Sequence, residues 1–427
     1  MTTLVPRATL RQIFGEVIEI SGPIIRAALQ NASIGALCKI DQGDGQLLAE
    51  VIGVSGPHAI LSPFSSMEGL KAHAPVRLQD SALTIPVGSG LLGRVIDAFG
   101  EPIDASGPVT GDTKAQAVRA AAPCAASRPL IDTKFATGLR AIDGILTLGR
   151  GQRIGLFGPP GAGKSTLLAA IARYSEADVI VIGLVGERGR EVREFTEREL
   201  PADKRRKVVV VTATSDRSPV ERALCAQSAT AVAERFRDEG KSVLLLIDSL
   251  TRTARALREI GLAAGEPPTR RGYPASVYPA LPALIERAGR SEVGDITAIY
   301  TVLIEGDGEG DPIAEEVRSL TDGHVMLSPA LAAAGHYPAI DISASLSRIM
   351  SAVTAKDHQD MAIKLRRHLT KYKEIEILLQ VGEYKAGGDR DADAAVSAKP
   401  RIDAFLRQSA DEKTVPSELI EQLGRAI

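Results

Sequence analysis

Tryptophan is absent from this sequence of 427 residues, and aromatic residues make up only 4% of it. Proteins that bind single-stranded nucleic acid stack the bases on aromatic rings, so this scarcity disfavours such a function. Basic residues are not in excess either, because 51 Lys and Arg stand against 53 Asp and Glu, for a net charge of −2. The near balance argues against a chain built mainly to coat nucleic acid, although it allows a local basic channel.

Cysteine is scarce as well. Cys38, Cys124 and Cys225 are too few and too scattered for a disulfide framework or a zinc site, which favours a reducing, cytosolic setting. No apolar run approaches the ~18 residues of a membrane span, and the opening MTTLVPRATLRQIFGEV lacks the apolar core of a secretory signal. We therefore expect a soluble intracellular protein with roughly two to four domains.

Residues 1–82 carry the pattern of several short strands. The segments EVIEISGP (16–23) and EVIGVSGP (50–57) echo each other, and each ends in a Gly-Pro turn signal. A single echo is too little for a repeat array. Two similar strands that end in similar turns explain it more simply, so the region is predicted to form a small N-terminal β-barrel.

Residues 83–357 are predicted to form an α/β domain that begins with a connector up to about residue 128. Its expected strands are RIGLFG (153–158), VIVIGLVG (179–186), KVVVVTAT (207–214), SVLLLID (242–248) and ITAIYTVLIE (296–305). Continuous aliphatic runs are typical of strands buried on both faces of a parallel sheet. Helical patterns separate most of these runs, which predicts right-handed crossovers.

Residues 358–427 are predicted to form a C-terminal helical domain, since MAIKLRRHLTKYKEIEILLQV spaces its apolar residues at three and four. The acidic cluster Asp389, Asp391 and Asp393 lacks the later Gly and Glu of a calcium loop. We expect a solvated loop with a helix cap there. Cys225 lies in a helical stretch and is expected to be a small core residue.

The strongest motif is GPPGAGKST at 158–166, which fits the phosphate-binding pattern G-x-x-x-x-G-K-[ST] between an expected strand and an expected helix. Glycines allow backbone N–H groups to surround phosphate oxygens, and the helix N-terminus adds partial positive charge. Lys164 is expected to reach the β- and γ-phosphates, and the Ser165 hydroxyl to bind Mg²⁺. The expected nucleotide-binding residues are Gly158, Pro159, Pro160, Gly161, Ala162, Gly163, Lys164, Ser165 and Thr166.

Two acidic residues follow expected strands. Asp248 ends SVLLLID and has the form of the acid that holds Mg²⁺ in such enzymes. Glu187 follows VIVIGLVG, so it lies beyond the carboxyl end of a strand, where ligands of open α/β sheets bind. A carboxylate there could orient the water that attacks the γ-phosphate. From spacing alone, Glu187 could equally form a salt bridge with the nearby arginines of GERGREVRE.

The chain resembles the ATPases of type III protein export, a family that serves the flagellum and the injectisome and is similar to the catalytic beta subunit of rotary ATP synthases. The resemblance covers about residues 15–410. It is carried by GERGREVREF (186–195), VLLLIDSLTR (243–252), RRGYPASVYPALPALIERAG (270–289), YTVLIEGDGEGDPIAEEVRSLTDGHVMLS (300–328) and HYPAIDISASLSRIM (336–350). It implies a P-loop NTPase core with a RecA-like parallel sheet, flanked by the N-terminal barrel and the C-terminal helices.

By the same resemblance, several residues acquire roles. Glu187 matches the catalytic glutamate, and Arg188 matches an arginine that contacts the γ-phosphate. Arg348 in SLSRIM resembles an arginine that reaches into a neighbouring subunit's nucleotide site; by itself it would be taken for a surface residue that caps the next helix. Tyr337 in HYPAID matches an aromatic that packs against adenine, with core packing as the alternative.

An arginine that acts in trans demands a ring, and the resemblance implies a homohexamer that hydrolyses Mg-ATP to power chaperone release, unfolding and export of proteins. Its implied partners are export chaperones, secreted substrates, the central stalk, the membrane-embedded export gate and a stator, with no nucleic acid. About ten residues precede the first expected strand, fewer than in family members that dock the stator there. The implied location is cytoplasmic, at the inner face of the bacterial inner membrane.

Three other functions compete with export. A catalytic subunit of a rotary ATP synthase is disfavoured by GERGREVREF and by KYKEIEILLQVGEYKAGGD, which are closer to the export enzymes. A ring-shaped RNA translocase is disfavoured by the net charge and by the few aromatics. A non-catalytic ring subunit would be expected to lack Lys164 or Glu187, and both are present.

Overall fold

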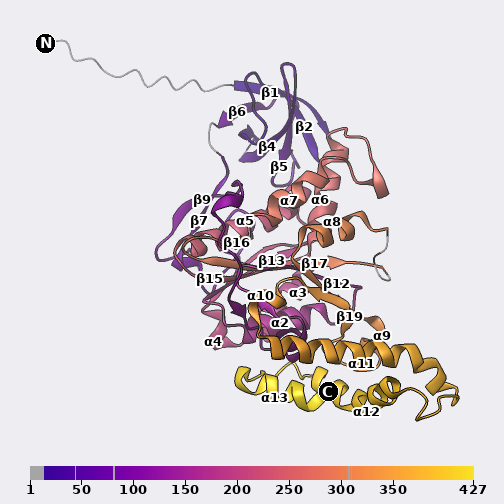
Figure 1. The fold of residues 1–427 in the computed structure, drawn as a ribbon. Coiled ribbons are helices and arrows are strands. Elements are labelled where there is room, and N and C mark those ends of the chain that lie inside the picture. Colours follow the sequence, from indigo (N-terminus) through magenta and orange to yellow (C-terminus); the bar gives the residue numbers. More distant parts are fainter. Residues whose placement is uncertain (1–13, 44, 80–81, 306–307, 309) are drawn as a thin grey trace.

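The computed structural model describes residues 14–43, 45–79, 82–305, 308 and 310–427 of the chain. Figure 1 shows three layers along the long axis: a β-barrel at one end, a large sheet with its helices in the middle, and a bundle of helices at the other end. The expectation that the amino terminus is no secretory signal falls almost entirely on residues 1–13, outside the described ranges. None of the helices in those ranges is long and apolar enough to cross a membrane.

Six strands close the predicted N-terminal barrel in the order β1-β2-β5-β4-β3-β6. They are β1 Phe14–Ser21, β2 Ile24–Ala28, β3 Leu37–Asp41, β4 Gln46–Ser55, β5 His58–Pro63 and β6 Pro75–Gln79. Alternate residues such as Val17, Ile25 and Val51 point inward and are fully buried. Closure pairs every strand on both sides, so the barrel has no free sheet edge.

The repeated sequence segments form equivalent hairpins of this barrel. β1 turns into β2 at Gly22, and β4 turns into β5 at Gly56; the two glycines have φ of 56° and 58°, a left-handed conformation that glycine adopts without strain. Each ladder shifts register directly after its valine, Val17 or Val51. The echo in the sequence therefore encodes the same bulge and the same turn twice, as expected for two similar strands.

The middle layer is a nine-stranded sheet in which β19-β18-β12-β17-β15-β13-β14-β8 form the main path and β16 pairs with β17. Its strands are β8 Val95–Ile96, β12 Arg153–Gly158, β13 Val179–Val185, β14 Val208–Ala213, β15 Ser242–Asp248, β16 Gly289–Arg290, β17 Asp295–Leu303, β18 Gly323–Leu327 and β19 Ile340–Ser347. All five expected strands are present, and they are parallel to one another. The predicted RecA-like α/β core is confirmed.

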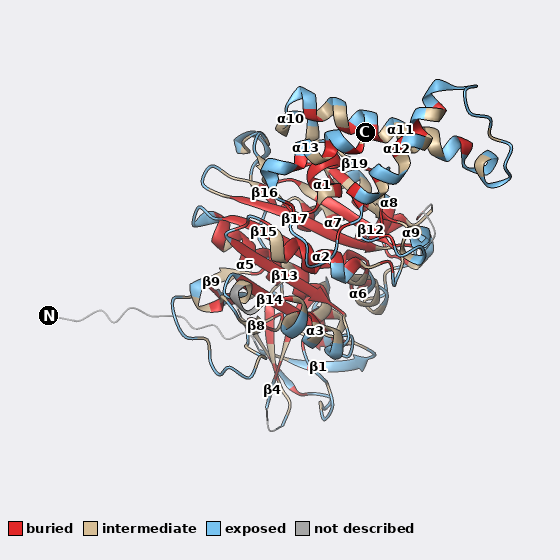
Figure 2. Cartoon of the chain, turned by 90° about the horizontal axis from the view of Figure 1, so that it is seen from below, coloured by how far each residue is buried: buried red, intermediate tan, exposed pale blue. Residues whose placement is uncertain are grey.

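Helices cover both faces of this sheet, so its strands are buried throughout (Figure 2). One face packs against α5 Pro219–Asp238, α6 Leu250–Ala263, α7 Val277–Ile285 and α8 Pro312–Leu320. The other packs against α1 Arg140–Ile145, α2 Lys164–Tyr174 and the C-terminal helices. Along β13, Val181 belongs to the first core while Ile180 and Ile182 belong to the second, which is why the run is aliphatic at every position. Cys225 is buried in the first core, as expected.

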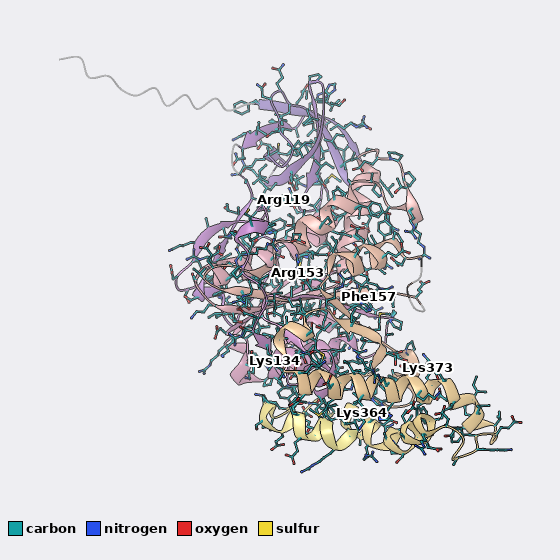
Figure 3. The ribbon with its side chains drawn as sticks, in the orientation of Figure 1. Arg119, Lys134, Arg153, Phe157, Lys364 and Lys373 are labelled. Carbon is teal, nitrogen blue, oxygen red and sulfur yellow. The ribbon has the colours of Figure 1, made fainter. Side chains whose placement is uncertain are left out.

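Short elements join these layers. The two-stranded sheets pair β7 Thr84–Val87 with β9 Lys114–Ala117, and β10 Lys134–Phe135 with β11 Leu148–Gly149. The short helices are α3 Gly189–Glu194, α4 Ala202–Arg205, α9 Pro329–Ala333 and α10 Met350–Val353. Arg119 lies where the barrel meets the middle layer (Figure 3), and its guanidinium pairs with the buried carboxylate of Glu50 on β4, at 3.0 Å.

The tail consists of α11 Lys356–Gln380, α12 Arg390–Leu406 and α13 Pro416–Ala426, which confirms the predicted C-terminal helices. Asp389 caps α12 by accepting hydrogen bonds from the N–H groups of Asp391 and Ala392. This acidic segment therefore contains the helix cap that the sequence predicts. Buried Gln408 fastens the tail to the middle layer through Arg140 N–H and Gly138 C=O.

Candidate active site

The phosphate-binding motif lies at the carboxyl edge of the sheet, between the end of β12 and the start of α2. Gly161 and Gly163 have φ of 82° and 83°, where a residue with a Cβ would be strained. Gly163 is the N-cap of α2, and its carbonyl accepts the first helical hydrogen bond from Leu167 N–H at 3.0 Å. The motif therefore forms the strand-loop-helix cradle that the sequence predicts.

Lys164 is a buried cation between two carboxylates. Only 9% of the residue is exposed. Burial lowers the pKa of its ammonium, and the negative charges of Asp248 and Glu187 partly offset that effect. A buried ammonium at a helix N-terminus is stabilised by an anion that approaches through the open side of the cradle.

Asp248 lies at the end of β15 and is 5% exposed. Its Oδ1 accepts a hydrogen bond of 2.6 Å from Thr301 Oγ1 on the neighbouring strand β17, which fixes the carboxylate. Asp248, Ser165 and Thr166 line one cavity of about 330 Å³. A carboxylate and a hydroxyl are oxygen ligands of the type that Mg²⁺ takes beside a bound triphosphate, so these residues fit that ion.

Glu187 lines the same cavity, two residues beyond Val185, the last residue of β13. Its Oε2 lies 3.1 Å from the Nη1 of Arg252. Burial, a hydrogen bond with Glu191 and the nearby charge of Asp248 raise the pKa of Glu187 to about 8, against the opposing effect of Arg252. The carboxyl is therefore held close to ionisation at neutral pH, which suits a group that orients water and accepts a proton.

Arg252 was not among the residues expected from the sequence. It lies in the first turn of α6, where its N–H donates to the Ser249 hydroxyl at 3.3 Å, and its guanidinium donates to Gly186 C=O as well as pairing with Glu187. The only sequence signal was its place in SLTR, directly after Asp248. The contact itself depends on β13 and β15 being neighbours in the sheet.

Arg188 does not line this cavity, although Glu191, its partner, does. Its side chain is 76% exposed, and its guanidinium is 3.5 Å from the carboxylate of Glu191 on α3. The structure therefore places it on the surface next to Glu187 rather than beside Lys164. Its contact with a γ-phosphate stays a prediction.

Tyr337 packs over the phosphate cradle. A Cβ built on Gly163 would lie 3.2 Å from the Cε1 of Tyr337, so the ring covers that glycine. The residue is 46% exposed, which argues against simple core packing. Its carbonyl accepts a hydrogen bond of 2.9 Å from Gln408 N–H. An aromatic ring with one open face beside the cradle is suited to stacking on a base.

Arg348 lies at the opposite edge of the sheet. Its N–H donates to Asp322 C=O at 3.0 Å, and the carboxylate of Asp322 accepts a hydrogen bond from Arg153 N–H at the first residue of β12. The cradle starts at the last residue of that strand, roughly 17 Å away at ~3.3 Å per residue. Within the ranges that the structure describes, the exposed guanidinium makes no ion pair. The fold thus gathers Lys164, Ser165, Glu187, Asp248 and Tyr337 and leaves Arg348 apart from them.

Family models match most of the chain. The nucleotide-binding domain of the ATP synthase alpha/beta family matches residues 138–347, and the beta-barrel domain of that family matches residues 17–78. The C-terminal domain of the T3SS EscN ATPase matches residues 354–425.

Curated relatives span nearly the same length. The type 3 secretion system ATPase of Xanthomonas euvesicatoria is 52% identical over 96% of this chain and 93% of the relative. That of Sinorhizobium fredii is 50% identical over 98% and 93%. The flagellum-specific ATP synthase of Bacillus subtilis is 44% identical over 96% and 94%.

Among solved structures, the assembled ATPase EscN of the enteropathogenic E. coli type III secretion system superimposes with a TM-score of 0.92 at 44% identity. The match covers 96% of this chain and 99% of EscN. EscN in complex with its central stalk EscO gives a TM-score of 0.89 at the same identity and coverage.

The raised pKa of Glu187 predicts a pH-dependent stability in the absence of nucleotide and Mg²⁺. The folded protein binds this proton more tightly than the unfolded chain, so its stabilising effect is present at low pH and is lost as the pH rises toward 8. Glu187→Gln mimics the protonated carboxyl. We expect its Tm advantage over the parent to widen from about pH 5 to about pH 8 and then level off.

Thermal unfolding in EDTA across this range measures the effect. The control is Glu376→Gln on the exposed face of α11, whose Tm difference from the parent should not change with pH. A constant difference for Glu187→Gln would contradict the raised pKa.

Proposed function

This chain belongs to the type III secretion and flagellar export ATPases, which are built on the ATP synthase alpha/beta fold, and we propose that it works in a secretion apparatus rather than in a flagellum. It is an ATPase of type III protein export. Identities of 50% and 52% to secretion ATPases, against 44% to the flagellar one, support the finer assignment. A C-terminal match to the EscN family along residues 354–425 speaks against a rotary synthase subunit.

One observation carries the chemistry: Ser165, Glu187 and Asp248 line a single cavity at the carboxyl edge of a parallel sheet, and the charges of Glu187 and Asp248 act on the buried ammonium of Lys164. Lys164 and the N-terminus of α2 bind the β- and γ-phosphates of ATP. Ser165 and Asp248 hold Mg²⁺, which when bound neutralises charge on the phosphate oxygens. Tyr337 stacks on the adenine.

Glu187 orients the attacking water and accepts its proton. Arg252 holds the carboxylate in place through the contact of 3.1 Å. As the bond to the leaving phosphate breaks, charge on the γ-phosphoryl oxygens is stabilised by Lys164 and by an arginine from outside the protomer. Arg188 can supply a further contact only if its exposed side chain swings from Glu191 toward the nucleotide.

Arg348 is the arginine proposed to act from outside. It lies across the full length of β12 from its own cradle, so it serves the site of a neighbour. Each protomer then offers Arg348 on one face and the cradle on another, a heterologous contact that closes into a ring. We propose a homohexamer, in keeping with the assembled state of EscN.

The proposed partners follow from the family. The central stalk that accompanies EscN suggests an equivalent stalk here. Export chaperones and secreted proteins would meet the C-terminal helices, where Ile377 and Val381 of the α11 end are 72% and 62% exposed. A stator and the membrane-embedded export gate complete the proposal, at the cytoplasmic face of the inner membrane.

Hydrolysis should depend on two residues in different ways. We expect Lys164→Ala to abolish both ATP binding and turnover, because it removes the cation from the cradle. Glu187→Gln should lower turnover by about 10²–10⁴-fold and retain ATP affinity, because it removes only the group that handles water. Phosphate release and fluorescent-ATP binding measure the two properties; near-normal turnover of Glu187→Gln would overturn its assignment.

Arg348 should act in trans. We expect Arg348→Ala to lower turnover by about 10³-fold or more with little change in nucleotide affinity. Rings that mix Arg348→Ala with Glu187→Gln should recover activity, because some interfaces then pair an intact arginine with an intact glutamate. Rings shown to be mixed by two affinity tags, yet without recovery, would place the arginine in cis.

The apparatus can be identified by affinity purification from the native cell. We expect components of a secretion apparatus among the co-purifying proteins, in a sample cross-linked before lysis. Recovery of flagellar basal-body components instead would contradict the finer assignment and leave the ATPase assignment intact.

A further inference from the structure

The peptide that carries Arg348 is held by the chain on both sides of it. Ser347, just before the arginine, donates its hydroxyl proton to Thr147 C=O at 2.9 Å. Ile349, just after it, packs on Gly149: a Cβ built on that glycine would lie 3.0 Å from Ile349 Cγ2. Both contacts are made by the short segment 147–152 that leads into β12, which we name the 147–152 turn.

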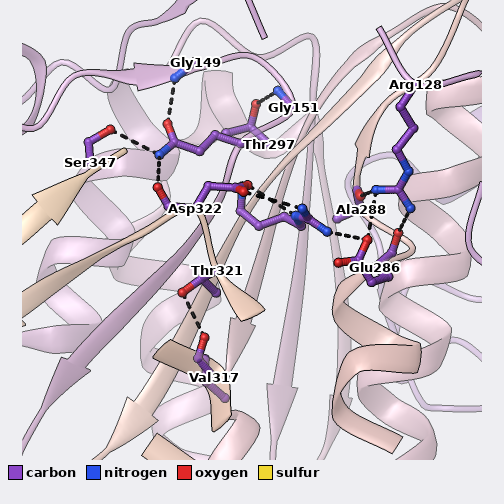
Figure 4. Close-up of polar contacts among 12 residues, drawn as sticks. Arg128, Gly149, Gly151, Glu286, Ala288, Thr297, Val317, Thr321, Asp322 and Ser347 are labelled. Atoms are coloured by element: carbon purple, nitrogen blue, oxygen red, sulfur yellow. Dashed lines mark hydrogen bonds and ion pairs between the residues drawn. The ribbon is translucent and has the colours of Figure 1, made fainter. Parts of the chain in front are cut away.

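Gln152, the last residue of this turn, makes three side-chain hydrogen bonds. Its side-chain Nε2 donates to Asp322 C=O at 3.1 Å and to Ser347 Oγ at 3.2 Å, and its Oε1 accepts from Gly149 N–H at 2.9 Å. Gly149, Asp322 and Ser347, the partners in these three hydrogen bonds, lie close to one another in Figure 4. The residue is fully buried, and its amide thus uses both donors and its acceptor.

The carbonyl of Asp322 links Gln152 directly to the arginine. It accepts one hydrogen bond from Gln152 and another from the N–H of Arg348. The two backbone segments also pack tightly here. A Cβ on Gly323, the residue after Asp322, would lie 2.4 Å from Leu346 C=O. Arg348 is exposed, and the hydrogen bond from its N–H to Asp322 C=O holds the backbone from which its side chain extends.

We propose that Gln152 is a positioning residue for Arg348: it fixes the backbone from which the arginine projects toward the neighbouring protomer. The inference rests on the proposed trans role of Arg348. An interaction with a developing phosphoryl charge requires accurate placement, since an error of ~1 Å can cost about a hundredfold in rate. Gln152 supplies that placement from the far end of the strand that carries the protomer's own phosphate cradle.

The test variant is Gln152→Met, which keeps the length of the side chain and removes all three hydrogen bonds. We expect kcat to fall by roughly tenfold to a hundredfold while the KM for ATP stays within about twofold, because the nucleotide site lies at the other edge of the sheet. The matched control is Thr297→Val. Thr297 is fully buried, and its hydroxyl accepts from Gly151 N–H at 2.9 Å, one residue from Gln152. Among the described residues, no hydrogen bond joins its side chain to Ser347 or Asp322.

Mixed rings separate positioning from general damage. Gln152→Met should regain activity with Glu187→Gln, in about a quarter of the interfaces of a random one-to-one mixture, and should gain none with Arg348→Ala. If Gln152→Met instead damaged its own cradle through β12, Arg348→Ala would rescue it and Glu187→Gln would not. That rescue pattern would overturn the proposal. So would a rise in KM in place of the loss of kcat, a loss of kcat in Thr297→Val equal to that in Gln152→Met, or unchanged turnover of Gln152→Met.

A second variant covers the case in which Gln152→Met does not assemble. Ser347→Ala removes one partner of Gln152 and leaves the bond between Arg348 and Asp322, so we expect a smaller loss of kcat with the same rescue by Glu187→Gln; any other rescue pattern overturns the proposal. The mixture of Arg348→Ala with Glu187→Gln is the reference. Its failure would refute the trans role itself, whereas its success with a wrong pattern for the Gln152 and Ser347 variants would refute only the positioning role.

Discussion

The length of a single parallel strand separates the two halves of the catalytic apparatus proposed for this protein. β12 begins at Arg153, whose N–H donates to the carboxylate of Asp322, the residue that also binds Arg348 N–H, and it ends at Gly158, where the phosphate cradle starts. Strands are stiff and extended, so the two ends of β12 are held apart at a fixed distance that no side chain bridges. A protomer built in this way carries a site and an arginine that cannot meet each other, and under the proposed trans role a second copy alongside supplies the arginine.

Charge inside the cavity depends on the same sheet. Parallel strands present their carboxyl ends at one edge, which brings Asp248 from β15 and Glu187 after β13 to the buried ammonium of Lys164. Five carboxyl side chains line this cavity, those of Glu187, Glu191, Glu194, Glu199 and Asp248. Burial is the largest cause that raises the pKa of Glu187 to about 8, and the hydrogen bond with Glu191 and the charge of Asp248 add to it. The Arg252 guanidinium limits this effect by pairing with Glu187. The charges around the cavity therefore suit a ligand that carries phosphates and a divalent cation together.

Most of the fold could be predicted from the sequence because its signals are local. Aliphatic runs marked the five central strands, the spacing of apolar residues marked α11, and the repeated EVI-x-x-S-G-P segments marked two hairpins of the barrel. The short strand β8, within the expected connector, was missed because two residues carry no periodicity. It is part of the sheet because β14 offers it a free edge.

The residues of the site likewise divide into those that the sequence reveals and those that only the fold reveals. The cradle, Lys164, Ser165 and Asp248 were recognisable in the sequence, because backbone geometry around a phosphate demands glycines, a lysine and a hydroxyl at set spacing. Arg252 and Gln152 belong to no such motif. Arg252 meets Glu187 across two neighbouring strands, and Gln152 holds the Arg348 segment from about two hundred residues away in the chain. Both contacts form only when distant segments fold together. Tertiary structure also turned Arg188 to the surface and set Tyr337 on Gly163. The sequence alone determined which chemical groups are present and which local elements carry them; the packing of the sheet decided which of those groups meet, because contact across strands depends on their order and register and not on spacing along the chain.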